Sequence, residues 1–328
     1  SSRQRRLGYR LAVFGLLFIG LLTLFPDAKS IELAASTPLT CIVCGEVGGV
    51  DFFLNVLLFI PLGLGLGLAG FSWRRALILA FLLSFSVELL QMKVILGRDA
   101  SLGDVITNTA GGGLGALVAA RWRQVLLPQE RAALRLAASW AFALVVIWSG
   151  TAWAMAVALP VGTRWYGQWA ADLGYLAPFL GTPLSVSAGG LVLPPGPSID
   201  QASLEAAVAE DPSVAVRAIL ATPPRRFAPI GSVMDADRRE VMFLGQERRD
   251  LAYRIRIRAA LLKLRVPTVN LKNGMDGQPG DTVDAEGAVR NGAYVLSSRI
   301  GDVVRTRTLP LSASWGWSLV TPWNSVLG

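Results

Sequence analysis

Long apolar stretches, all in the first half of the chain, constrain the fold more than any other feature. Five of them alternate with short polar segments: Leu7–Phe25, Phe52–Gly70, Ala76–Leu96, Val105–Ala120 and Ala137–Leu159. A helix needs about 20 apolar residues to cross a bilayer, and all but the fourth stretch reach that length. The fourth is short and rich in glycine, but small residues let helices approach closely inside a membrane bundle. We therefore predict a membrane bundle of about five transmembrane helices in residues 1–160.

The composition supports a membrane protein and excludes several kinds of site. Hydrophobic residues make up 52% of the chain and charged residues 16%, whereas about 25% is usual for a soluble domain. The chain has no histidine. This excludes a Ser-His-Asp triad, a histidine-ligated zinc and a histidine-ligated haem. We expect no cofactor and no metal, and whether the protein is an enzyme is left open, leaning towards no.

Basic residues predict the orientation of the helices. Residues 1–160 hold 13 Lys and Arg, and ten of them lie before or at the beginning of the first stretch, between the second and third, or between the fourth and fifth. By the positive-inside rule these segments are cytoplasmic, so the N-terminus is cytoplasmic and residues 161–328 lie outside the membrane. The net charge of +8 then reflects topology, and we expect no nucleic-acid partner. The first stretch also fits a signal peptide, but we favour a membrane anchor.

Polar side chains gather at the ends of three stretches that this topology places on the outer side. Spacings of three and four residues put neighbouring members on one helix face. Ionisable groups beside a membrane are costly and indicate function, so we predict a polar pocket that opens at the outer-leaflet surface. Its expected residues are Asp51, Asn55, Ser84, Glu88, Gln91, Arg98, Ser101, Asp104 and Asn108.

Two structural alternatives to this pocket remain open. The pairs Asp51/Asn55 and Asp104/Asn108 would also serve as caps at helix N-termini, where carboxylates suit the helix dipole. Glu88 does not fit that explanation, because it precedes a helix C-terminus. A buried carboxylate there needs relief, either from a partner such as Arg98 or by protonation. The whole set would otherwise be a polar knot that holds three helices together.

Three motifs in this region resemble those of the VanZ-like membrane proteins. The resemblance covers about residues 40–120 and implies a multi-span membrane protein of the bacterial cell envelope, in the cytoplasmic membrane. It implies no catalytic role for any residue. The motifs are Asp51-x3-Asn55-x3-Phe59-x-Pro61-Leu62-Gly63, Ser84-x3-Glu88-x2-Gln91 and Arg98-x2-Ser101-x2-Asp104-x3-Asn108-x2-Gly111-x3-Gly115.

The two cysteines form a Cys41-x2-Cys44-Gly45 motif between the first two stretches, on the predicted outer side. An oxidising compartment makes them a disulfide candidate. We favour a structural staple or free thiols over redox exchange, because no thioredoxin-like context surrounds them. A zinc site would need further ligands.

The second half of the chain has the mixed charges of a soluble domain. We predict residues 161–200 as an interfacial linker, because Trp165, Tyr166 and Trp169 follow the last stretch as an aromatic belt would. Residues 201–328 are predicted as an extracytoplasmic β-sandwich, since apolar and polar residues alternate and Asn-Gly turns recur. The expected strands are Ser203–Val208, Ile230–Met234, Glu240–Leu244, Asp250–Arg258, Ala293–Ser298, Val303–Thr308 and Trp317–Thr321.

Part of this half resembles concanavalin-A and laminin-G-like jelly rolls, in the runs Ile230–Asp235, Phe243–Glu247 and Leu251–Arg256. Carbohydrate binding is common in that fold, but the fold does not imply the function. We expect the acids of one loop to be solvated rather than calcium ligands, and three arginines to form a solvated strand face. The tryptophans near the end are expected in the core or at the membrane interface. These sets are Asp276, Asp281, Asp284 and Glu286; Arg254, Arg256 and Arg258; and Trp315, Trp317 and Trp323.

Two functions follow from these features as hypotheses. In the first, the outer-leaflet pocket binds or acts on a lipid-linked cell-envelope molecule, with membrane lipids as partners. In the second, the protein is a non-catalytic accessory subunit of a larger membrane assembly, for instance a photosynthetic or envelope complex. Its helices would pack on other subunits and its β-sandwich would brace the periplasmic face. A transporter is less favoured, because no inverted repeat is recognisable.

Overall fold

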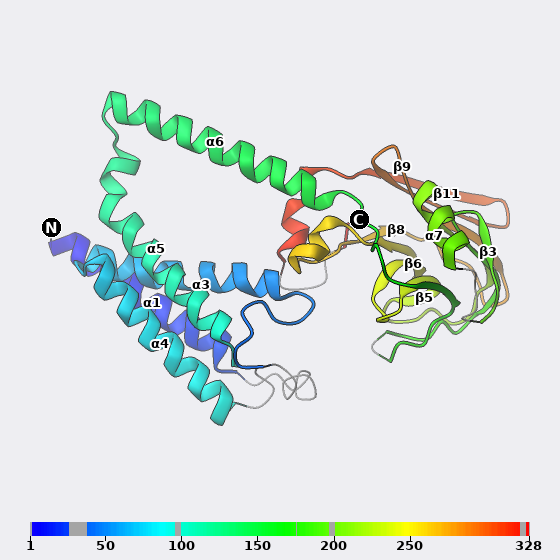
Figure 1. Cartoon of the computed structure of the whole chain (residues 1–328), viewed down its shortest axis with the longest axis horizontal. Coiled ribbons are helices and arrows are strands. Elements are labelled where there is room, and N and C mark those ends of the chain that lie inside the picture. The colour runs from blue at the N-terminus through cyan, green and yellow to red at the C-terminus, as the bar shows by residue number, and fades with distance from the viewer. Residues whose placement is uncertain are drawn as a thin grey trace. The chain divides into compact units, whose positions relative to one another are not determined.

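The computed structural model describes residues 2–25, 38–95, 100–174, 176–196, 201–321 and 326–327. The chain forms two compact units, Ser1–Ile147 and Trp148–Gly328. Figure 1 shows long helices in the first unit and β-sheets in the second.

Each of the five apolar stretches lies mainly in one long helix. These helices are α1 (Ser2–Thr23), α3 (Gly48–Ala69), α4 (Trp73–Lys93), α5 (Leu102–Leu126) and α6 (Glu130–Met155). By length and composition, α1, α3, α4 and α6 are candidate membrane spans. Helix α5 has 25 residues but is not among these candidates, because threonine, asparagine and glycine make it less apolar. The predicted α-helical membrane region is thus confirmed with four candidate spans, and a membrane-spanning α5 stays a prediction.

Small residues bring four of these helices into close contact. Helix α3 packs against α1 on one side and α5 on another, and α4 packs against α5. A Cβ atom added at Gly63 of α3 would meet the carbonyl group of Gly112 in α5. A Cβ atom at Gly65 would meet the backbone of Ala12 in α1. Packing without side chains at these points is the usual means of helix association in a membrane, where lipid is as apolar as leucine.

Helix α6 presents apolar side chains in nearly all directions over its residues 136–147, where Ser139 is the only polar residue. None of its described side chains in this range is buried. Trp140, Phe142 and Ile147 are 63%, 70% and 65% exposed. Lipid or another protein would cover this surface in a membrane, because a helix that is apolar all round is not stable against water.

The second unit is a sandwich of two six-stranded sheets, as predicted (Figure 1). All pairings are antiparallel except that of β8 with β12. In order across the first sheet, the strands are β1 (Trp165–Trp169), β5 (Ala228–Asp235), β6 (Glu240–Glu247), β7 (Asp250–Ile255), β8 (Thr268–Leu271) and β12 (Val326–Leu327). The second sheet contains β11 (Val303–Pro310), β10 (Ala293–Ile300), β9 (Thr282–Arg290), β4 (Ser213–Ile219), β2 (Thr182–Ala188) and β3 (Leu191–Leu193).

The sandwich core lies between the two sheets and contains side chains from both. Tyr253 of β7 and Tyr294 of β10 are fully buried there, with ring centroids 6.1 Å apart in an edge-to-face arrangement. The predicted alternation in β7 is confirmed, since Leu251, Tyr253 and Ile255 are all buried. The β9–β10 hairpin turns at Asn291-Gly292, where both residues have positive φ as a type I′ turn requires.

Residues 161–200 differ from the expected interfacial linker, because they supply strands β1, β2 and β3. Trp165 is only 5% exposed and belongs to the core. The indole of Trp169 donates a hydrogen bond to the carbonyl of Leu193 at 3.1 Å. These aromatic residues therefore do not form a membrane belt. Their burial depends on strands that follow much later in the chain, which a local pattern does not reveal.

Two expected strands are wrong. Ser203–Val208 lies in helix α7 (Gln201–Glu210), where Leu204 and Val208 are one turn apart and both buried. Alanine and glutamate favour a helix there, and this preference outweighs a short alternation. Most of Trp317–Thr321 lies in, or directly after, the 3-10 helix η2 (Ala313–Leu319), in which Ser318 donates to the carbonyl of Trp315. The β7 pattern also ends early, because Arg258 begins the 3-10 helix η1 (Arg258–Leu262).

The three arginines expected on a solvated strand face, Arg254, Arg256 and Arg258, instead contact other side chains. Arg254 forms an ion pair with Glu240 at 2.8 Å, and Arg256 lies 3.7 Å from Asp235. The guanidinium of Arg258 lies over the ring of Trp153, 5.6 Å from its centroid. Cation–π contact and ion pairing thus replace the expected contact with water.

The acids considered as calcium ligands also have protein partners. Asp276 pairs with Arg249 at 3.1 Å, and Asp284 pairs with Arg217 at 3.6 Å. Within the described part of the chain, no three His, Cys, Asp or Glu residues are grouped to hold a metal ion. Among the late tryptophans, Trp315 packs on the core, Trp317 is half exposed and Trp323 lies outside the described residues.

Candidate functional site

Eight of the nine predicted site residues lie at one end of the first unit. They come from the beginning of α3, the end of α4, and the beginning of α5 with the residue before it. The ninth, Arg98, lies outside the described residues. We call the eight residues the polar cluster: Asp51, Asn55, Ser84, Glu88, Gln91, Ser101, Asp104 and Asn108.

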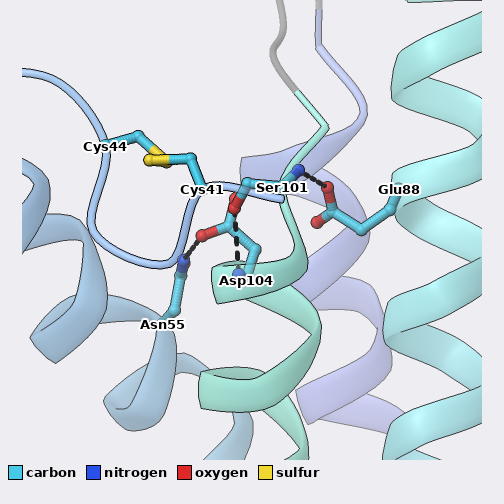
Figure 2. The surroundings of a disulfide bond; sticks show 6 residues. All are labelled: Cys41, Cys44, Asn55, Glu88, Ser101 and Asp104. Atoms are coloured by element: carbon cyan, nitrogen blue, oxygen red, sulfur yellow. Dashed lines mark hydrogen bonds between the residues drawn. A yellow bond between two sulfur atoms is a disulfide. The ribbon is translucent and has the colours of Figure 1, made fainter. Parts of the chain in front are cut away.

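A chain of hydrogen bonds connects three helices at this end (Figure 2). Asn55 of α3 donates from Nδ2 to Oδ1 of Asp104 in α5, at 2.6 Å. The backbone N–H of Asp104 donates to the hydroxyl of Ser101 at 3.0 Å. The backbone N–H of Ser101 in turn donates to Oε2 of Glu88 in α4, at 2.9 Å. The two carboxyl groups of Glu88 and Asp104 are thereby held close to the N-terminus of α5.

A second polar contact lies one turn further into the helices. Asn108 of α5 donates from Nδ2 to the hydroxyl of Ser84 in α4, at 3.0 Å. Both side chains are buried, with exposed fractions of 3% and 0%. The amide oxygen of Asn108 is also buried and has no hydrogen-bond partner among the described residues. Such an acceptor is rare inside proteins and indicates strain, function or a missing partner.

The remaining two members lie at the edge of the polar cluster. Gln91 donates from Nε2 to the backbone carbonyl of Thr23 at 3.0 Å, which attaches the end of α1 to α4. Helix ends leave four carbonyl groups without a partner inside the helix, so this contact satisfies one of them. The sequence gives no signal for it, because the acceptor is a backbone atom. Asp51 is exposed at the beginning of α3.

The disulfide loop forms part of the same end of the bundle. Cys41 and Cys44 are bonded to one another, in a loop that passes beside Ser101 and Asp104 (Figure 2). The backbone N–H of Leu102 donates to the carbonyl of Leu39 at 2.9 Å, and that of Gly103 donates to Cys41 at 3.2 Å. The loop therefore satisfies two of the four free N–H groups at the start of α5.

The sequence did not predict this contact between the loop and α5. Gly103 is required for it, because a Cβ atom there would meet the carbonyl of Ile42. The nearest sequence signal was the short spacing of Cys41 and Cys44, which holds the loop in a tight turn. That spacing does not indicate which helix the loop contacts.

The hydrogen bonds show which residues of the polar cluster cap a helix and which contact a neighbouring helix. Ser101 caps α5, since its hydroxyl accepts from the N–H three residues later. The side chains of Asp104 and Asn108 instead reach to α3 and α4. Chemically the polar cluster is rich in acceptors: three carboxyl groups and a buried amide oxygen. It is therefore suited to a molecule that presents N–H or O–H donors.

Comparison with known proteins agrees with the helical part of this description. The VanZ/LLP1 family model matches residues 10–123, which extend from α1 to α5 and include the whole polar cluster. The match begins earlier than the motifs noted in the sequence, because it takes in most of α1. No curated protein and no solved structure matches the chain. A specific relation of the β-sandwich to the concanavalin-A-like fold therefore stays a prediction.

Proposed function

Starting from the VanZ-like character of residues 10–123, we propose that this membrane protein binds a lipid-linked cell-envelope molecule through the polar cluster. The head of the molecule would carry amide, hydroxyl or ammonium groups, which match the acceptors there. Its lipid tail would lie along the exposed apolar faces of the neighbouring helices. With the predicted orientation, the head would be bound in the outer leaflet.

One observation carries this proposal: a buried acceptor beside two carboxyl groups at the end of an apolar bundle. The amide oxygen of Asn108 has no partner in the described part of the chain. Leaving such a group unsatisfied costs about 1–3 kcal/mol, and in a membrane no water compensates for it. A donor from a bound head group would remove this cost. Glu88, 7% exposed, would add a second acceptor nearby.

The test measures binding of lipid II, a lipid-linked disaccharide-peptide, to the purified full chain in lipid nanodiscs. The Ser84→Ala/Asn108→Leu variant removes both polar partners together, so neither is left unpaired. We expect the affinity to fall about tenfold, which corresponds to one lost hydrogen bond of about 1.4 kcal/mol. Glu88→Gln, which keeps size and acceptor but removes the charge, tests the carboxyl group.

Ser86→Ala is the matched control, because Ser86 lies on the same helix, is exposed and contacts only the carbonyl of Leu82 among the bonds described. It should bind lipid II as the wild type does. Equal affinity of the wild type and the Ser84→Ala/Asn108→Leu and Glu88→Gln variants would contradict the proposal, provided that all variants keep the thermal midpoint of a folded protein.

A second function, the accessory subunit, is favoured by a different observation. The apolar surface of α6 over residues 136–147 contains no buried side chain, and a partner helix would cover it as well as lipid does. Purification in a mild detergent from native membranes distinguishes the two. Stoichiometric co-purification of other membrane subunits would support this second function, and a lone chain that binds lipid II would support the first.

A further inference from the structure

A groove lies at the other end of the first unit, away from the polar cluster. It encloses about 1050 Å³ between the beginning of α1, the last turns of α3 and the last turns of α5. Asp104 of the polar cluster and Trp122 of the groove are 18 positions apart on α5, which is roughly 27 Å at 1.5 Å per residue. The groove is therefore a separate site, and nothing in the proposed function uses it.

One side of the groove is strongly basic. Arg3, Arg6 and Arg10 all line it from α1, with Leu7 between them. Spacings of three and four residues place these side chains on one helix face. No ion pair between described residues includes Arg3, Arg6 or Arg10. Three guanidinium groups thus line a single cavity, and no described acid forms an ion pair with them.

The other walls of the groove are apolar and accessible. Leu64 and Leu68 line it from α3, and Val118 and Leu126 line it from α5. Val118 and Leu126 are 51% and 69% exposed. A surface with a charged rim and an apolar floor matches an amphiphile, since guanidinium groups bind phosphate in a bidentate manner and apolar side chains contact acyl chains.

We propose that this groove binds one anionic phospholipid, with its phosphate at Arg3, Arg6 and Arg10 and an acyl chain along Leu64, Leu68 and Val118. Charge complementarity selects an anionic lipid, and the apolar floor selects a lipid over free phosphate. Basic pockets between membrane helices recognise anionic head groups by this combination. The site differs from ordinary attraction of positive flanks to a membrane because the arginines share a defined cavity with apolar walls.

The test titrates fluorescent phosphatidylglycerol onto the full chain in phosphatidylcholine nanodiscs. Arg3→Gln/Arg6→Gln/Arg10→Gln should weaken binding about a hundredfold, since each arginine near an anionic group contributes about 1 kcal/mol and 1.4 kcal/mol is tenfold. The matched control Arg74→Gln/Arg75→Gln/Arg131→Gln removes the same charge from residues that do not line the groove. Because these three residues do not contact a lipid in the groove, this control should change binding by less than about threefold.

A second variant tests the apolar floor without changing the charge. Val118→Trp fills part of the groove and should weaken phosphatidylglycerol binding, while inorganic phosphate should not compete in the wild type. Equal losses in the two arginine triples would show that only overall charge acts, and would overturn the proposal. Competition by inorganic phosphate, or unchanged binding in Val118→Trp, would also overturn it. Thermal midpoints check that each variant is folded, and lipid II binding serves as a separate readout for the polar cluster.

Discussion

Asn55 donates a hydrogen bond to Asp104 across 49 positions of the chain, with 2.6 Å between Nδ2 and Oδ1. This bond joins the beginnings of α3 and α5, two helices that already pack closely through glycine. It therefore fixes how the two helix ends meet, in addition to any part it has in binding.

The pair of Asn55 and Asp104 should show measurable coupling. In a double-mutant cycle of Asn55→Ala and Asp104→Ala we expect about 1–2 kcal/mol of coupling, which is near the lower limit for hydrogen bonds to charged groups and above the average for membrane helices. Thermal unfolding of the purified protein in detergent measures it. Additive effects of the two substitutions would show that the bond contributes no stability.

Close packing of α3 on α5 should not tolerate a methyl group at Gly63. The Cβ atom of Gly63→Ala would meet the backbone carbonyl of Gly112, so the helices must separate. We expect a loss of about 1–3 kcal/mol, as for other overpacked sites. Gly150→Ala in α6 is the control, because nothing lies within 4 Å of the added atom. It should be neutral or stabilising, and a similar loss in both variants would contradict the packing argument.

The disulfide should stabilise the start of α5 rather than the whole bundle. The closed loop is short, so the chain-entropy model gives only about 2 kcal/mol for the bond. In Cys41→Ser/Cys44→Ser we expect faster hydrogen exchange at the amides of Leu102 and Gly103, because their acceptors lie in the loop. Exchange in the middle of α4 is the internal reference. A reducing agent should reproduce the effect in the wild type and change nothing in the variant.

Two buried tyrosines of the sandwich should respond oppositely to the same substitution. The hydroxyl of Tyr253 donates to the carbonyl of Pro212 at 3.0 Å. That of Tyr294 is buried without a hydrogen-bond partner among the described residues. Tyr253→Phe should cost about 1–2 kcal/mol, whereas Tyr294→Phe should be neutral or stabilising. Urea unfolding of the full chain, followed by tryptophan fluorescence, measures both.

The same two residues determine how the sandwich responds to alkali. Burial raises the pKa of both Tyr253 and Tyr294 above the usual value. In the unfolded chain their phenols ionise near pH 10, so above about pH 10 the unfolded state binds fewer protons than the folded state. Stability should therefore fall as the pH rises above about 10, and less steeply in Tyr253→Phe/Tyr294→Phe. Identical pH profiles in the two proteins would contradict this.

The orientation predicted from basic residues can be tested with single cysteines in the Cys41→Ser/Cys44→Ser background. Glu46 precedes α3, Ser72 lies between α3 and α4, and Asp302 lies in the β10–β11 turn, all exposed. A membrane-impermeant maleimide should label Glu46→Cys and Asp302→Cys in intact cells, but Ser72→Cys only after permeabilisation. If only Ser72→Cys is labelled in intact cells, the predicted orientation is wrong, and the polar cluster does not lie in the outer leaflet.

The sequence alone determined which segments of the first half become long apolar helices, and it located five strands of the sandwich: β5, β6, β7, β10 and β11. Length and apolarity decide the former, because a bilayer core demands both, and the alternation in β7 predicts its buried face. The alternating order of the apolar stretches also indicated that Asp51, Asn55, Glu88 and Asp104 lie at one end of the helices. These features are local, so a local pattern is sufficient to identify them.

Only the tertiary structure decided which groups touch. Asn108 meets Ser84 rather than capping its own helix, Gln91 binds a carbonyl of α1, and the disulfide loop covers the start of α5. The same holds for Trp165, which is buried by strands far along the chain, and for the arginines that face the groove. Such contacts depend on how whole helices and sheets pack, and their partners are distant residues or backbone atoms that leave no periodic signal in a sequence.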